Sequence, residues 1–227
     1  MCAGDDKWGV DFVRRQVPLM DQFPFIFTIF FMLLGPIKII PTFVGLTRDA
    51  DLPFKRALAI HGTLIASALV LFVAVAGGTI LDKYQISVNA LRIAGGVVLV
   101  IAGLNAIFWP PRAVRAQPGS TVLQLAAAPL TIPAIVPPAG IAALLIFIML
   151  APDYPGMWLA IGIALVIVMI LDFLVMYFID VVVKTPGVML ALQVLGATLI
   201  FIQLCIGVEI ILRALTDLGL VAVRGNA

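Results

Sequence analysis

Six apolar stretches, each long enough to cross a lipid bilayer, constrain the fold of this 227-residue chain more than any other feature. A membrane-spanning helix needs about 20 mostly apolar residues, and in lipid the backbone polar groups must bond within the segment. The stretches are Phe23–Leu46, Ala59–Leu81, Val88–Phe108, Leu125–Leu150, Met157–Ile179 and Val188–Leu212. The sequence therefore predicts an all-α, polytopic membrane protein with six transmembrane helices.

Composition agrees with a membrane protein and excludes several classes of function. Hydrophobic residues make up 63% of the chain and charged residues 11%, with a mean hydropathy of +1.20. A soluble domain is about half apolar and a quarter charged, so lipid must cover much of this surface. The basic residues are scattered over the predicted loops, without the clustered patch that nucleic-acid binding requires. We expect the lipid bilayer as a partner, and no nucleic acid.

The residues that carry most enzyme and metal chemistry are scarce. His61 is the single histidine, and Cys2 and Cys205 are the two cysteines, so neither a His-ligated metal nor a disulfide framework is predicted. No Ser–His pair or carboxylate dyad is visible in the sequence. We expect no cofactor, no metal site and no catalytic residue, and therefore no enzyme.

The two halves of the membrane region align at an offset of about a hundred residues. Pro36 aligns with Pro137, Lys83 with Lys184, and the segment 91–96 with 192–197. A unit with an odd number of spans, repeated once, enters the bilayer in opposite orientations, as in many transporters. The sequence thus predicts two inverted three-helix repeats. The predicted organisation is an N-terminal tail at 1–22, repeat 1 at 23–108, a connecting loop at 109–124, repeat 2 at 125–214 and a C-terminal tail at 215–227.

The N-terminal tail admits two interpretations. Trp8, Phe12 and Val13 would form one apolar face of a short helix lying in the membrane interface, with Arg14 and Arg15 toward the headgroups. The alternative is a solvated tail.

Prolines interrupt the first and fourth spans at matching places. Proline lacks an N–H and clashes with the carbonyl four residues earlier, so each helix must kink or unwind there. Non-helical backbone at membrane depth is stable only inside the protein or against a wet cavity. Two such Pro-broken spans predict a solute-binding centre, formed by freed carbonyls and helix ends; simple packing kinks are the alternative.

Lys38 and Asp172 are the two most deeply placed charges. Both lie about two-thirds of the way along odd-numbered spans, which run in the same direction, so they sit at similar depth in the membrane. We therefore predict a Lys38–Asp172 pair, which would lower the desolvation cost of each charge. The alternative has Lys38 reaching the interface along its alkyl chain. The i,i+4 spacing of Glu209 and Arg213 predicts a local pair. Asn105 and Gln203 are expected either to line the interior or to form a hydrogen bond to a neighbouring helix. The candidate substrate-binding residues are Gly35, Pro36, Lys38, Pro41, Thr131, Pro133, Pro137, Pro138 and Asp172.

Three motifs resemble the MarC family of membrane proteins. Gly35-Pro36 through Pro41-Thr42-Phe43 to Leu46-Thr47 is similar to that family's first-span motif, residues 86–96 to the start of its third span, and residues 128–138 to its Pro-rich fourth span. The resemblance covers about residues 23–214. It implies a multi-pass protein of the bacterial inner (cytoplasmic) membrane, grouped with neutral amino acid transporters and, more distantly, LysE-type exporters.

The chain departs from the family pattern at both breaks. Gly35 stands where the motif has Asn, and Pro137-Pro138-Ala139 stands where the motif has Gly-Pro-Gly. Two functions follow: a secondary transporter or exporter of small polar solutes such as amino acids, or a non-transporting accessory or assembly subunit of a larger membrane complex. The first predicts a small-molecule substrate, and the second membrane-complex partners; a homo-oligomer fits both. A polar cavity between the first and fourth spans favours the transporter, whereas an apolar filling favours the subunit.

Overall fold

The structure is a computed structural model that describes residues 19–108, 119–185 and 187–220. Every regular element in these ranges is helical, which confirms the predicted all-α class. The elements are α2 (Leu19–Leu34), α3 (Pro36–Leu46), α4 (Leu52–Lys83), α5 (Val88–Phe108), α6 (Val122–Leu125), η1 (Ala126–Ile135), α7 (Pro138–Leu150), η2 (Ala151–Asp153), α8 (Met157–Tyr177), α9 (Ile179–Lys184) and α10 (Val188–Asp217). The interfacial helix predicted around Trp8, Phe12 and Val13 lies outside the described residues.

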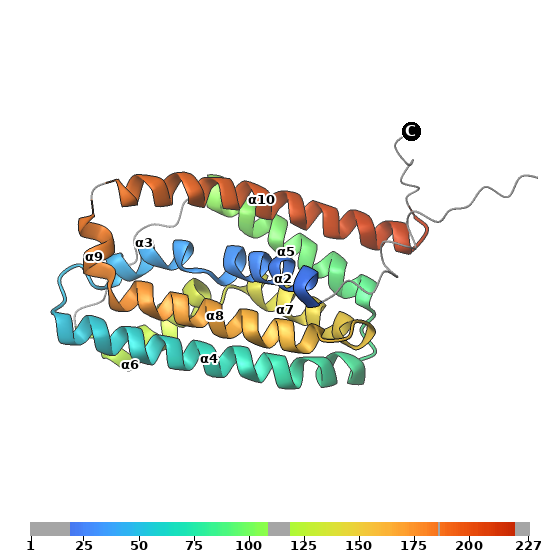
Figure 1. Cartoon of the computed structure of the whole chain (residues 1–227), viewed down its shortest axis with the longest axis horizontal. Coiled ribbons are helices and arrows are strands. Elements are labelled where there is room, and N and C mark those ends of the chain that lie inside the picture. Colours follow the sequence, from blue (N-terminus) through green and yellow to red (C-terminus); the bar gives the residue numbers. More distant parts are fainter. Residues whose placement is uncertain (1–18, 109–118, 186, 221–227) are drawn as a thin grey trace, which may run out of the picture.

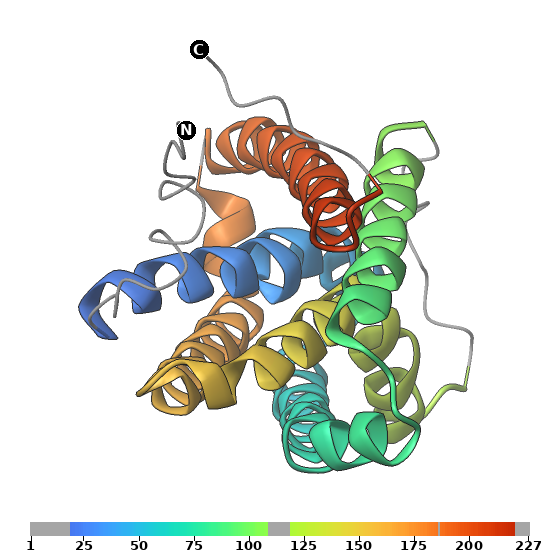
Figure 2. The ribbon, with the colours of Figure 1, turned by 90° about the vertical axis from the view of Figure 1, so that its right-hand side faces the viewer.

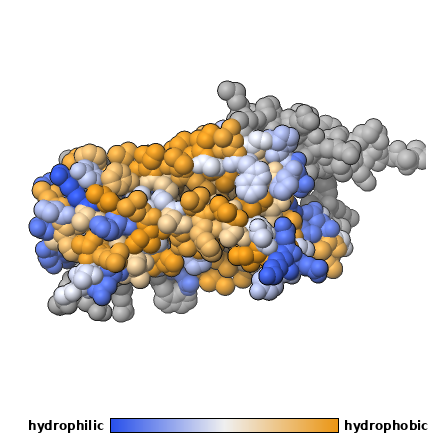
Figure 3. Space-filling view, turned by 90° about the horizontal axis from the view of Figure 1, so that it is seen from below, coloured by the Kyte–Doolittle hydropathy of each residue, from blue (hydrophilic) through white to orange (hydrophobic). Residues whose placement is uncertain are grey.

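The described helices provide five segments long and apolar enough to cross a membrane, and a sixth if the bent α6–η1–α7 segment is one span. Figure 1 shows them side by side along the long axis of the molecule. In Figure 3 apolar residues form a broad band across the middle of the visible face, with hydrophilic residues toward both ends. The protein is therefore built to lie across a bilayer.

The helix that starts at Leu52 is longer than the predicted second span, which begins at Ala59. The Asp51 carboxylate accepts a hydrogen bond from the Phe54 backbone N–H at 3.2 Å, and Pro53 stands in the first turn. Both features favour a helix N-terminus. Pro53 therefore starts this helix, although it reads as a loop residue in the sequence.

The segment before α7 is irregular because prolines follow two of its residues. Ala128 (φ −150°, ψ 131°) and Ile132 (φ −120°, ψ 120°) are extended, as residues before proline prefer to be. The segment 122–135 and the segment 138–153 meet at an angle of 63°. The Thr131 hydroxyl donates to the Ala126 carbonyl at 2.7 Å and so gives one backbone carbonyl of this irregular segment a hydrogen-bond partner.

The helices alternate in direction along the chain. α2–α3, α5 and α8 run from right to left in Figure 1, whereas α4, α7 and α10 run from left to right. We call the left end, which holds α9, the α9 end, and the opposite end, which holds η2, the η2 end.

The two halves of the chain are interleaved. α2 packs against α8, while η1 and α7 pack against α4, and α5 packs along α10. Viewed end-on in Figure 2, α3 and α7 lie near the middle and α2 runs inward from the left edge, with α5 and α10 above and to the right and α4 and α8 below. The bundle core is thus made from both halves.

Candidate functional site

The first and fourth predicted spans meet in the bundle, where α3 packs against η1 and α2 against α7. Their contact is apolar: Ile39, Leu130 and Ile135 are all at most 1% exposed. A Cβ added at Gly140 would lie 2.9 Å from Leu34 Cγ, so these two helices approach as closely as their side chains permit. The sequence left two expectations for the space between these spans, a polar cavity or an apolar filling. In this conformation apolar side chains fill it.

The predicted site residues separate into interior and peripheral groups. Gly35 and Pro36 are buried where α2 ends and α3 begins, with Gly35 in an extended conformation (φ −73°, ψ 169°). Thr131 is 1% exposed, and its hydroxyl is used by the backbone of its own segment. Pro137, which precedes α7, is half-buried. The exposed members are Pro41, Pro133 and Pro138.

Lys38 is held by a glutamine rather than by an aspartate. Its Nζ donates to Gln203 Oε1, and Gln203 Nε2 donates to the Leu99 carbonyl at 3.2 Å. The predicted Lys38–Asp172 pair is therefore wrong for this structure, because Gln203 of α10 takes the ammonium group. The chain of bonds joins α3, α10 and α5, which confirms that Gln203 bonds to neighbouring helices.

Among the described residues, Asp172 is a buried acidic side chain without a partner. Its side chain is 0% exposed, and neither carboxylate oxygen has a hydrogen-bond partner among the described residues. It lies on the inward face of α8, in a stripe with Val168 and Met176, which are 0% and 1% exposed. Placing a charge at this depth costs at least about 2.5–3.5 kcal/mol on insertion scales. An ionised Asp172 therefore destabilises the folded protein in this position.

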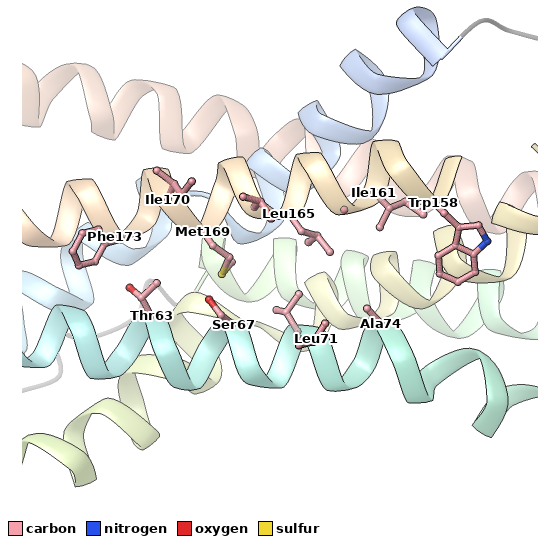
Figure 4. Close-up of a pocket in the computed structure, with 13 residues that line it drawn as sticks. Thr63, Ser67, Leu71, Ala74, Trp158, Ile161, Leu165, Met169, Ile170 and Phe173 are labelled. Carbon is pink, nitrogen blue, oxygen red and sulfur yellow. The ribbon is translucent and has the colours of Figure 1, made fainter. Parts of the chain in front are cut away.

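A cavity of about 580 Å³ lies between α4 and α8, and it is open to the outside of the bundle, since Leu71, Val166 and Ile170 in its lining are all more than half exposed. Figure 4 shows its walls, with Thr63 and Ser67 of α4 opposite Phe173 and Met169 of α8, and Trp158 at the far end. The lining residues are Thr63, Ser67, Val70, Leu71, Ala74, Trp158, Ile161, Gly162, Leu165, Val166, Met169, Ile170 and Phe173. The cavity is therefore mostly apolar, with two hydroxyl groups on one wall.

Sequence reasoning missed this cavity, although a signal for it exists. Thr63, Ser67 and Ala74 recur at helical spacing and place small or polar side chains on one face of α4. Small residues on a membrane helix commonly mark a face turned toward another helix. The partner helix is α8, and this pairing cannot be read from the pattern on α4.

Polar contacts close the α4–α8 seam at the α9 end. Lys55 Nζ and Asp180 Oδ1 are 2.7 Å apart, and the Arg56 guanidinium lies 5.0 Å from the centre of the Tyr177 ring. A comparable ion pair, Arg92 to Asp217 at 2.7 Å, joins α5 and α10 at the η2 end. Arg92 and Asp180 both lie near the ends of predicted spans, but the sequence does not identify their partners.

The predicted local pair on α10 is confirmed. Arg213 Nε and Glu209 Oε1 are 2.7 Å apart and four residues apart in sequence. Both side chains are more than half exposed, so the pair belongs to the surface of the helix and not to an interior site.

Comparison with known proteins identifies relatives over most of the membrane region. The sequence model of a family described as "MarC family integral membrane protein" matches residues 20–218. A UPF0056 membrane protein of Archaeoglobus fulgidus is 30% identical over 121 residues, which is 52% of this chain and 57% of that protein. A UPF0056 membrane protein of Pyrococcus horikoshii is 39% identical over 99 residues, 43% of this chain and 48% of that protein.

A bacterial relative is also similar to this chain. The UPF0056 membrane protein YhcE of Escherichia coli K12 is 29% identical over 89 residues, 38% of this chain and 41% of that protein. The chain thus spans about half the length of several of the curated relatives it matches. No solved structure matches it.

Proposed function

Since the chain belongs to the MarC family of integral membrane proteins, we propose that it is a secondary transporter or exporter of small polar solutes such as amino acids, and not an enzyme. We place it as a multi-pass protein in the bacterial inner membrane, consistent with its Escherichia coli relative. The structure represents a closed conformation in this proposal, with the solute pathway collapsed between the two halves.

One observation carries the proposal: interrupted helices from the two halves of the chain pack against each other inside the bundle. α3 begins at Pro36 immediately after the end of α2, and it contacts η1, whose backbone is extended at Ala128 and Ile132. Pro36 and Pro41 each take an N–H donor away from the carbonyl four residues earlier. Carbonyls without a helical donor, at the contact between halves, are the groups with which carriers of this kind bind a solute.

The arrangement of the halves supports inverted repeats with Pro-broken first and fourth spans. The α2–α3 segment and the α7 segment run in opposite directions (Figure 1), as inversion requires. The packing is also reciprocal, since the first span contacts α8 of the second half and the fourth contacts α4 of the first half. This reciprocal packing is the arrangement expected when two halves are related by a two-fold axis in the membrane plane.

A second candidate function is an accessory or assembly subunit of a membrane complex. The apolar filling of the crossing favours it, because Leu34, Ile39 and Leu130 occupy the place where a solute would bind. In that case the exposed apolar surface of the helices would contact partner proteins as well as lipid.

Flux measurements on purified protein in proteoliposomes separate the two functions. Wild-type protein should exchange at least one labelled neutral amino acid faster than empty liposomes, and Pro36→Ala should lower that rate because a continuous helix removes the free carbonyl. Pro53→Ala is the matched control, since Pro53 is exposed in the first turn of α4, where no helical carbonyl needs its missing N–H. Folded wild-type protein that moves no amino acid of the panel would favour the accessory subunit.

A further inference from the structure

Asp172 is a buried acidic group to which no contact in the described structure gives a role. Its side chain is 0% exposed, and both oxygens are buried without a hydrogen-bond donor among the described residues. A carboxylate that were merely structural would be expected to have a donor, because an unpaired buried charge is among the costliest features of a protein interior. The missing donor is the observation that requires an explanation.

The charged groups on the elements around α8 have other partners or lie elsewhere. α8 packs against α2, α3, α4, α9 and η2, and α2 carries no titratable residue between Gln22 and Leu34. Lys38 of α3 bonds to Gln203, Lys55 to Asp180, and Arg56 stacks on Tyr177. The remaining charged or titratable side chains on these elements, counted from Gln22 onward, are exposed: His61, Asp82, Lys83, Asp153 and Lys184.

A proton fits the site better than a metal cation does. Hard cations require about six or more oxygen ligands, whereas the buried neighbours of Asp172 on α8, namely Val168, Met169 and Met176, have no oxygen in their side chains. Within the described ranges no three His, Cys, Asp or Glu residues are grouped so as to hold a metal. A proton needs only the carboxylate itself, and it removes the buried charge.

The cavity between α4 and α8 lies next to Asp172. Met169, one turn before Asp172, and Phe173, directly after it, both line the cavity. Thr63 and Ser67 stand opposite these two residues in Figure 4, and the Thr63 hydroxyl oxygen is buried without a partner among the described residues. Hydroxyl groups at this end of an otherwise apolar cavity provide polar sites where water can approach the carboxyl group.

We propose that Asp172 is a proton-binding site, which holds a proton while the α4–α8 seam is closed and exchanges it with water when the seam opens. The proton binds to one carboxylate oxygen, is taken from water and returns to water, so no other reactant takes part. If the protein is a transporter, as proposed above, this proton is the ion whose movement is coupled to the solute.

Infrared difference spectroscopy of the reconstituted protein tests the proposal without any solute. Spectra recorded at acidic and alkaline pH should differ in a carboxylic-acid C=O band, and that band should be lost in Asp172→Asn and kept in Asp153→Asn, whose side chain is exposed. Wild-type protein containing aspartate ¹³C-labelled at the side-chain carboxyl provides a second measurement that needs no variant. Its band should shift to lower frequency.

Each outcome decides between the site and its absence. A pH-dependent band that shifts with the label and disappears in Asp172→Asn establishes the proton site. A difference spectrum that the substitution leaves unchanged, or a labelled wild type without a pH-dependent aspartic-acid band, overturns it. Because no solute is present, failure of this test differs from failure of the flux assay. If Asp172 binds a proton but the protein moves no amino acid, the proton-binding site is established and the transporter function is rejected.

Discussion

The α5–α10 pair depends on facing glycines, and a single methyl group there should destabilise the protein. A Cβ added at Gly96 would lie 2.5 Å from Ile211 Cγ1 and 2.7 Å from the Gly207 carbonyl oxygen. A Cβ added at Gly207 would in turn lie 3.0 Å from the Gly96 carbonyl oxygen. Because one obstacle is backbone, the side chain of Ile211 cannot relieve the clash by moving, and the two helices must separate.

The size of the effect follows from two opposing contributions. Inserting a methyl group into close packing costs about 1–3 kcal/mol, whereas alanine in place of glycine inside a helix favours folding by about 0.5–1 kcal/mol. We therefore expect Gly96→Ala to lower the free energy of unfolding by about 1–2 kcal/mol. Adding Ile211→Ala should restore only part of this loss, because the contact with the Gly207 carbonyl remains.

Unfolding in bicelles with increasing dodecyl sulfate, followed by far-ultraviolet circular dichroism, measures the difference. Gly162→Ala is the control, because its Cβ would meet nothing within 4 Å and only the gain in helix propensity remains. The reasoning is refuted if Gly96→Ala is as stable as Gly162→Ala, or if Ile211→Ala restores the full loss.

The same unfolding measurement checks three further expectations. Thr131→Val should lower the free energy of unfolding by about 1 kcal/mol, since its hydroxyl bond to the carbonyl five residues earlier is buried; wild-type stability would contradict a role for that bond. A double-mutant cycle of Lys38→Met and Gln203→Leu should give a coupling of about 1 kcal/mol, and additive effects would mean that the contact contributes nothing. Lys55→Ala should lower the free energy of unfolding by less than about 1 kcal/mol, because the side chains of Lys55 and Asp180 are 17% and 35% exposed and water screens their attraction. A larger loss would show that water screens this ion pair less than its exposure implies.

Features set by local sequence could be predicted. Apolar stretches of sufficient length give the helical membrane fold, because a lipid environment leaves the backbone few alternatives. The i,i+4 spacing of Glu209 and Arg213 gives their ion pair without knowledge of the tertiary structure. In the same way the positions before Pro129 and Pro133 are extended, because the clash with proline is local.

Features that depend on which helices are neighbours could not be predicted. Equal depth in the membrane made Lys38 and Asp172 look like partners, but depth does not specify the direction in which a side chain points around its helix. Gln203 reaches Lys38 only because α10 lies beside α3. The cavity between α4 and α8 likewise depends on which helices pack together, and the apolar surfaces of these two helices do not specify that choice.

Apolar packing, and not charge, holds the two halves together. The ion pairs Lys55–Asp180 and Arg92–Asp217 each join the halves at opposite ends of the bundle, but partly exposed pairs contribute at most about 1 kcal/mol each. The α5–α10 contact, by contrast, brings backbone close to backbone at Gly96 and Gly207, and it cannot slide without the loss of many van der Waals contacts. The α4–α8 seam is already separated by a cavity over part of its length, so a movement between the halves meets less resistance there. Any change of conformation should therefore pivot on α5–α10 and open at α4–α8, where Asp172 lies beside the cavity.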